Sequence, residues 1–302
     1  MVERSSNLPT TALARAAIAK TPERRRLALH AFLRHRLAVA GAVVIVLITL
    51  AALFAPVVAT VDPDAVDLKA VREAPNSHHL LGTDEVGRDV YSRVIYGSRV
   101  SISVGLVSVT IYAIIGIVLG SLSGYYGGLV DGVIQRLTDT VMCFPSLVII
   151  IAAVALLGAS IYNIMIVIGL LTWPNICRLV RGQFLSLREK EFVEAAHALG
   201  ARDRRIIFRH ILPNAIAPVI VAATFGVAAA ILTEAGLSFL GLGVQPPTPS
   251  WGNMINTAQS AAVLQQMPWL WIPAGFMIAI AVLSINFIGD GLHDALDPRT
   301  RR

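Results

Sequence analysis

Charged residues are scarce in this sequence. Asp, Glu, Lys and Arg make up 15% of the 302 residues, whereas a typical soluble domain has roughly 25%. Three long stretches contain no charged residue and a fourth contains only one, Glu234: Leu37–Val61, Val100–Val130, Thr140–Cys177 and Ile211–Gly289. Together with a hydrophobic content of 55%, this pattern excludes an ordinary soluble domain and predicts an all-α integral membrane protein.

Cysteine is nearly absent, with Cys143 and Cys177 as the two examples. Both fall at membrane depth or at its edge, so the sequence excludes a disulfide framework and we expect two packing residues. The sequence contains no Gly-x-x-x-x-Gly-Lys-Ser/Thr phosphate loop, so the chain cannot hydrolyse ATP by itself. The predicted spans contain no nucleophile with a matching base, and we therefore expect no catalytic residue.

Two small groups of residues invite a metal-site interpretation, and both are better explained as solvated residues. His78 and His79 are adjacent in a polar segment without nearby cysteine, so we expect exposed loop residues. Asp290, His293 and Asp294 follow the last apolar stretch, so we expect a solvated helix end. The sequence thus predicts no metal site and no cofactor bound by this chain.

The lengths of the apolar stretches determine the number of membrane crossings. A bilayer crossing takes about 20 apolar residues, so Thr140–Cys177 must fold back, near Gly158, and Ile211–Gly289 must divide near Gln245–Pro249. Pro145 and Pro174 are expected to kink their helices. Six transmembrane helices are predicted, at about residues 37–60, 100–123, 133–157, 161–181, 214–236 and 269–289.

Lys and Arg are distributed unevenly. Residues 1–36 and 178–213 hold eight each, whereas residues 236–270 hold none. Since basic segments stay on the cytoplasmic side, both termini are predicted to be cytoplasmic, and the +6 charge is no sign of a nucleic-acid partner. The predicted organisation is a basic N-terminal segment (1–36), a first transmembrane helix (37–61), an external loop (62–99), a five-helix core (100–290) with a cytoplasmic loop (182–213), and a cytoplasmic tail (291–302).

The charged block Glu191–Asn214 covers most of that cytoplasmic loop and ends at the first residue of the fifth predicted span. Ser186 and Glu189 form a capping-box pattern that predicts a helix start, and Gly200 stands where a helix C-terminal glycine belongs. Asp203 can cap a second short helix that ends near Ile211. Small and apolar residues recur with the period of one helix face: Phe192, Ala195, Ala196 and Leu199. We therefore predict two short helices that form a docking corner, with an ordinary surface loop as the alternative.

Four segments together resemble one known family. Glu194-Ala195-Ala196, Gly200 and Leu212-Pro213 have the spacing of the EAA loop of ABC importer permeases, with His210 where the pattern has Ile. Three further segments resemble the C-type subunit of dipeptide and oligopeptide importers: Leu81–Asp89 with Ser92-Arg93, Ser238–Trp251, and Gly289–Leu292 with Leu296–Arg299. The chain is identified as a member of the peptide/nickel family of ABC importer permeases, as its C-type inner-membrane subunit.

The resemblance implies a type I ABC importer permease fold in a bacterial inner membrane. It implies that this subunit forms half of a pathway for di- and oligopeptides and couples to cytoplasmic ATPases. The implied coupling residues are Glu194, Ala195, Ala196, Gly200, Leu212 and Pro213. The implied partners, besides membrane lipids, are a second homologous permease, two ATPase subunits that hold ATP and Mg, and an extracytoplasmic substrate-binding protein. Gly200→Pro or Glu194→Lys is expected to abolish transport and to leave membrane insertion intact.

Two other functions remain open at this stage. Within the same family, the cargo could be nickel or another small solute. An ion-driven secondary transporter is a different class, and it predicts acids at the membrane midplane or matched broken helices. Glu234 is the one candidate acid, and its place about 30 Å along the fifth span puts it near the outer surface.

Two features of the spans are predicted to serve packing or gating. An acid within a membrane span is a functional candidate, so Glu234 could contact a substrate ammonium or help to close an outer gate. A structural partner at the interface is the alternative for Glu234. Gly116, Gly120 and Gly124 repeat at four-residue spacing in the second span, and such small residues let helices pack closely.

Overall fold

The computed structural model describes residues 29–296. Most of the predicted N-terminal segment 1–36 and the end of the predicted tail 291–302 lie outside the described residues. Within residues 29–296 the chain is helical, and the β-type pairing is limited to a bridge between Thr83 and Asp89. The prediction of an all-α protein is confirmed.

The helices vary in length from single turns to spans of the full membrane thickness. In chain order they are α2 (Arg36–Leu53), α3 (Ala55–Val58), α4 (Val90–Tyr126), α5 (Gly128–Met142), α6 (Ser146–Leu157), α7 (Ile161–Arg188), α8 (Glu191–Ala198), α9 (Asp203–Arg205), α10 (Leu212–Phe239), α11 (Trp251–Asn256), α12 (Ala261–Gln266) and α13 (Ile272–Leu296). A π-helical turn (Ile206–Ile211) joins α9 to α10, and single 3₁₀ turns follow α11 and α12.

Five helical spans in the described range are long and apolar enough to cross a bilayer, and α5 with α6 would make a sixth. The third predicted span, 133–157, is therefore not one straight helix. Its two halves meet at an angle of 80°, at a break that contains Pro145. Proline cannot donate the backbone hydrogen bond that a continuous helix needs there, so the predicted kink at Pro145 is confirmed as a full break.

Other boundaries differ from the prediction at the helix ends. The second span begins at Val90, so the last part of the predicted loop 62–99 is the first turns of α4. Asp89 explains this early start, because its carboxylate accepts a hydrogen bond from the Ser92 N–H at 2.8 Å and caps the helix. The last span continues to Leu296, well into the predicted tail. Pro174 lies inside a continuous α7.

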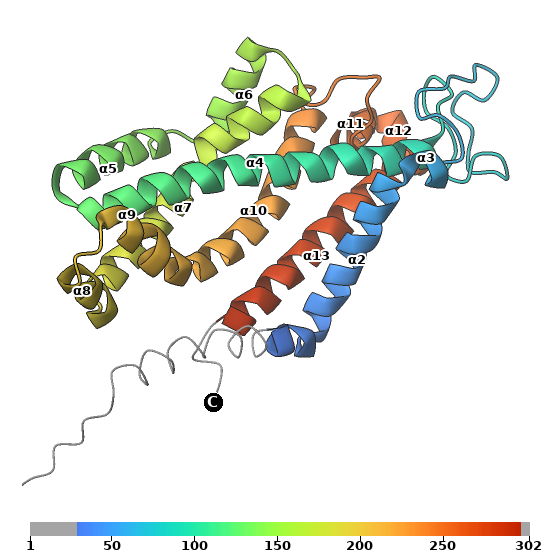
Figure 1. Ribbon diagram of the computed structural model, residues 1–302. Helices are drawn as coiled ribbons and strands as arrows, with labels where there is room; N and C mark the ends of the chain where they lie inside the picture. The colour runs from blue at the N-terminus through green and yellow to red at the C-terminus, as the bar shows by residue number, and fades with distance from the viewer. Residues whose placement is uncertain (1–28, 297–302) are drawn as a thin grey trace, which may run out of the picture.

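The long helices pack around α4 and α10. α4 lies against α7, α10 contacts both α4 and α13, and α2 lies beside α13 (Figure 1). Figure 1 also shows that α8 and α9 lie at one end of α4, whereas α11, α12 and the loop between α3 and α4 lie at the other. Since α4 has 37 residues, these two ends are separated by about 55 Å.

Candidate functional site

The predicted docking corner is a short helix, α8, held against the end of the helix bundle. Two of its side chains point into the bundle, since Val193 is 1% exposed and Ala196 is 7% exposed. They join an apolar cluster whose other buried members at this end include Phe184, Ile206, Ile207 and Ile211. Burial of apolar side chains, rather than hydrogen bonding, therefore holds α8 in place.

The opposite face of α8 is apolar and open to solvent. Phe192 is 41% exposed and Leu199 is 88% exposed. Ala195 and Glu194 are exposed between them. Of the four residues predicted for one face, Ala196 points inward, and Phe192, Ala195 and Leu199 form the outward face. We refer to these three residues as the outward face of α8.

Gly200 ends α8 through a Schellman motif. The Ala201 N–H donates to the Ala196 carbonyl at 3.0 Å, and the Gly200 N–H donates to the His197 carbonyl at 2.9 Å. Gly200 has a φ of 74°, and a Cβ atom there would have no heavy atom within 4 Å. The glycine is therefore required by backbone conformation and not by lack of space.

Two details of the predicted corner are wrong. The capping box does not start a helix, because α7 runs through Ser186 to Arg188 and the residue before α8 is Lys190, which makes no side-chain cap. The second short helix is not a separate element, because the π-helical turn joins it to α10 without a break.

Proline chemistry explains the π-helical turn. The ring of Pro213 would clash with the carbonyl four residues earlier in a regular α-helix, and a wider turn removes this clash. The Leu212 N–H accordingly donates to the Ile207 carbonyl, five residues back. Leu212 and Pro213 thus begin a membrane span and do not belong to the outward face of α8.

Polar contacts that no sequence pattern predicts connect this corner to α4. The Tyr125 hydroxyl donates to Asp203 Oδ1 at 2.8 Å, and the Tyr125 ring lies parallel to His197 with 6.4 Å between centroids. Nearby, Arg181 of α7 holds Asp131 of α5 with two hydrogen bonds of 2.6 Å. A single tyrosine at a helix end has no sequence signature, so only the fold reveals its partner.

Gly116, Gly120 and Gly124 all face α7. A Cβ atom added at Gly116 would lie 2.6 Å from Ile176 Cβ, and one at Gly120 would lie 2.5 Å from the Cys177 carbonyl oxygen. At Gly124 it would lie 2.5 Å from Phe184 Cβ. The backbones of α4 and α7 therefore approach each other at all three positions more closely than any side chain would allow.

Glu234 is sealed inside the protein near the end of α10. Its side chain is 0% exposed, and Oε1 accepts hydrogen bonds from Ser238 at 2.7 Å and from Ser250 at 3.0 Å. Ser250 is also the N-cap of α11. This geometry favours the structural alternative, in which Glu234 fixes α11 on α10, because a bound substrate would have no access to the carboxyl group. The role of Glu234 in a gate stays a prediction.

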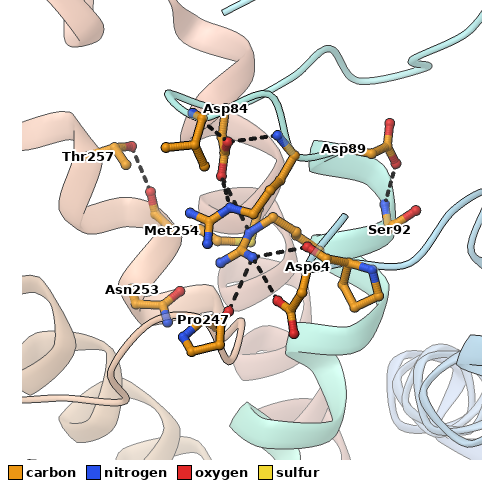
Figure 2. Close-up of polar contacts among 12 residues, drawn as sticks. Asp64, Asp84, Asp89, Ser92, Pro247, Asn253, Met254 and Thr257 are labelled. Atoms are coloured by element: carbon orange, nitrogen blue, oxygen red, sulfur yellow. Dashed lines mark hydrogen bonds and ion pairs between the residues drawn. The ribbon is translucent and has the colours of Figure 1, made fainter. Parts of the chain in front are cut away.

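The end of the molecule opposite α8 is organised around Arg93. Its Nη1 donates to the carbonyl oxygens of Pro63 at 3.1 Å and Pro247 at 3.2 Å, and it lies 3.5 Å from Asp64 Oδ1. Its Nε lies 3.8 Å from Asp84 Oδ2. Figure 2 shows Asp64, Asp84 and Pro247 arranged around these converging contacts. One buried guanidinium thus joins segments that lie far apart in the sequence.

The two histidines of the polar segment do not behave alike. His79 is not an exposed loop residue: its side chain is 17% exposed, and Nδ1 lies 3.0 Å from Oδ1 of the buried Asp89. This contact braces the N-cap of α4. Within residues 29–296, no group of three or more His, Cys, Asp or Glu side chains has an arrangement that could hold a metal ion.

Comparisons with known proteins cover nearly the whole chain. The family model described as the binding-protein-dependent transport system inner membrane component matches residues 116–302. The model described as the N-terminal transmembrane domain of oligopeptide transport permease C matches residues 24–75. A putative peptide permease protein of Brucella suis biovar 1 is 45% identical over 268 residues, which cover 89% of each chain.

A second relative and a solved structure agree with these matches. The dipeptide transport system permease protein DppC of Alkalihalophilus pseudofirmus is 44% identical over 268 residues, 89% of this chain and 88% of the relative. An inward-facing structure of the MetNI methionine ABC transporter matches with a TM-score of 0.53 and 17% identity, over 68% of this chain and 97% of that one. At this identity the likeness concerns the fold, and it confirms the expected type I ABC importer permease fold.

Proposed function

The chain belongs to the family of inner membrane components of binding-protein-dependent transport systems, and we propose that it carries di- and oligopeptides across the bacterial inner membrane as one half of an ATP-driven importer. Members of this family are transport subunits, so the ATP is hydrolysed by partner subunits. The two relatives are named as a putative peptide permease and a dipeptide permease, which favours peptides over nickel as cargo. Membership in an ABC family likewise disfavours the ion-driven secondary transporter.

The outward face of α8 is the observation that supports coupling to an ATPase. Phe192 and Leu199 are exposed on a helix whose other face is buried, and such an apolar face on a protruding element fits a groove in a partner protein. Ala195 lies between them and has a side chain small enough for a close approach. We place α8 on the cytoplasmic side, because residues 178–213 are rich in Lys and Arg.

A displacement of α8 can reach three membrane helices. α7 ends two residues before α8 begins, and α10 follows through α9 and the π-helical turn. α4 is attached by the hydrogen bond between Tyr125 and Asp203. When ATP closes two ATPase subunits together, a helix seated in one of them would move these three spans relative to the others and alternate the opening of the pathway.

Co-purification of the full importer tests this coupling. We expect the wild-type chain, expressed with its partner subunits, to retain the ATPases after detergent extraction. Leu199→Asp places a charge within the proposed contact, so it should remove the ATPases and abolish peptide uptake. The second permease should remain bound, because Leu199 lies on an element outside the membrane spans.

Leu80→Asp provides the matched control. Leu80 is 54% exposed at the other end of the molecule, so the same substitution there should leave the ATPases bound. Retention of the ATPases and of uptake by Leu199→Asp would contradict the proposed role of α8. Peptide uptake by this chain without any ATPase would contradict the proposed function as a whole.

A further inference from the structure

The segment Leu81–Asp89 is the part of the sequence resemblance that transport coupling leaves unexplained. In the structure it forms one wall of a recess at the end opposite α8. The recess has a volume of about 360 Å³, which is within the usual range for small-molecule sites. Most of its lining comes from the segment 84–88, the start of α4, the loop 241–246, and α11 with the turn after it; Ser238 and Leu270 complete it.

The backbone of this wall has little freedom. Gly87 has a φ of 82°, and a Cβ atom there would collide with the backbone carbonyl of Asp67. Asp84 Oδ1 accepts hydrogen bonds from the backbone N–H groups of Val86 at 3.0 Å and Arg88 at 2.9 Å. The turn therefore presents Arg88 to the recess in a fixed position.

Several arginine N–H donors of the recess have no acceptor within the described part of the protein. The Arg88 side chain makes one hydrogen bond within the protein, in which Nε donates to Asp84 Oδ2 at 2.7 Å. Within the part of the chain that the structure describes, its two terminal amino groups and Nη2 of Arg93 make no hydrogen bond. These nitrogen atoms are not fully buried. Each can therefore still be reached by solvent or by a ligand. A guanidinium with both amino groups available is the preferred protein ligand for a carboxylate.

The acidic residues of the recess are already occupied. Asp84 accepts from Arg88 and from two backbone groups, and Glu85 lies 3.2 Å from Nη2 of Arg72. The formal charges of the two acids that line the recess, Asp84 and Glu85, balance those of the two arginines that line it, Arg88 and Arg93. A recess without net charge would not concentrate a simple anion such as a lipid phosphate. A zwitterionic ligand that offers a carboxylate to the unused N–H groups fits better.

We propose that this recess is an outer subsite of the permease, in which Arg88 and Nη2 of Arg93 bind the C-terminal carboxylate of a short peptide. The assignment rests on the peptide cargo of the proposed function. Apolar residues that line the same recess, such as Met254 and Leu270, would contact the side chain next to that carboxylate. The subsite would receive peptides at the end of the molecule that faces away from the ATPases.

Direct binding to the assembled importer tests the subsite. The full complex in nanodiscs, without the substrate-binding protein, is titrated with the dipeptide Ala-Phe and with its C-terminal amide. We expect the wild-type complex to bind the acid about tenfold or more tightly than the amide, because loss of a hydrogen-bonded charge leaves the arginine without a partner. Arg88→Gln should bind the acid more weakly and lose most of the preference, with Arg93 as the remaining donor, and Arg88→Lys should recover part of the preference.

Arg72→Gln is the matched control, because Arg72 carries the same charge on the same loop and does not line the recess. It should keep the preference for the acid. Equal binding of acid and amide by the wild-type complex, or an unchanged preference in Arg88→Gln, would overturn the proposal. A third result would also overturn it. If the substrate-binding protein is added and Arg88→Gln weakens only its docking, the carboxylate that Arg88 binds belongs to that protein.

The failure of the subsite can be distinguished from the failure of the proposed function. Arg88 lies at the end of the molecule opposite α8, so the Arg88→Gln chain should still co-purify with the ATPases. If that holds while the binding preference is absent, the subsite alone is rejected. If the wild-type chain does not assemble with ATPases, the proposed function is rejected first.

Discussion

The two ends of α4 are built in opposite ways. At one end, α8 is held by the burial of Val193 and Ala196, and most of its remaining surface is exposed. At the other end, irregular backbone is held by polar groups that are themselves buried, such as Arg93 at 4% and Asp89 at 1% exposure. Apolar contacts are non-directional, and hydrogen bonds to a guanidinium are directional. The first end can therefore tilt or detach as a unit, whereas the second has one well-defined arrangement.

This contrast suits the two tasks proposed for the ends. An element that follows an ATPase must move without the loss of many specific bonds. A wall that presents Arg88 to a ligand must not move, since a small displacement would cost much of its affinity. Substitutions can test whether the two ends differ in this way.

Arg93→Met should destabilise the whole protein. The substitution removes the donor for the Pro63 and Pro247 carbonyl oxygens and leaves Asp84 with one cation fewer. Asp84 keeps Arg88 as a partner, but each carbonyl oxygen left without a donor typically costs about 1–3 kcal/mol. We expect the thermal unfolding midpoint of the purified complex to fall on the order of 10 °C.

Arg72→Gln separates this effect from a general loss of charge. Arg72 pairs with Glu85 at the surface, where both side chains are nearly half exposed, so its removal should change the stability by less than about 1 kcal/mol. If the two variants unfolded at the same temperature, the polar network around Arg93 would not be what holds this end together.

Val193→Asp should release α8 and leave the rest of the protein folded. A buried aspartate without a partner is unfavourable, but undocking of α8 relieves it, so the cost is limited to the about 2–3 kcal/mol that α8 gains from burial. Trypsin cleavage at Lys190 and Arg202, which flank α8, should accelerate while the global unfolding midpoint stays nearly constant. Leu199→Asp, on the exposed face, should leave the cleavage rate unchanged.

A global loss of stability in Val193→Asp would contradict the comparison, because it would make α8 part of the same cooperative unit as the spans. A faster cleavage in Leu199→Asp would contradict it as well, since that residue would then contribute to holding α8.

Gly200→Ala should have the smallest effect of the three. The φ of 74° strains any residue with a Cβ atom by about 1–2 kcal/mol, although the surrounding space is open. Trypsin cleavage around α8 should therefore rise less than in Val193→Asp. Gly182→Ala, at an equally open position inside α7, should be neutral or slightly stabilising. Equal behaviour of the two alanine variants would show that the backbone of Gly200 is not constrained.

Sequence patterns predicted the features that depend on residues close together in the chain, namely the spans, the helix breaks and the helix ends. Charge-free runs indicate spans, Pro145 indicates a break, and Gly200 indicates a helix end, because each effect arises within a few residues of its cause. The same reasoning placed the helix start at Ser186, where α7 in fact continues, since packing of Phe184 in the core outweighs a capping preference.

The contacts of the polar end could not be predicted from the sequence. Arg93 binds Pro247 and Tyr125 binds Asp203 across long separations along the chain, and no periodicity records such a pairing. Leu81–Asp89 was recognisable as a motif, but its role as the wall of a recess depends on the loop 241–246, which has no complementary signature. The inward turn of Ala196 likewise follows from the packing of α8 against the π-helical turn and α7.

The π-helical turn before Pro213 determines how α10 is rotated about its own axis relative to α8. A turn closed by bonds to the fifth residue back holds one more residue than an α-helical turn, so everything after it is rotated relative to α8. The angle between the outward face of α8 and the side chains that α10 directs toward its neighbours is thus set by the number of residues in the turn Ile206–Ile211. Deletion of a single residue from this turn would rotate all of α10 relative to α8, although no residue of α8 or α10 itself would change.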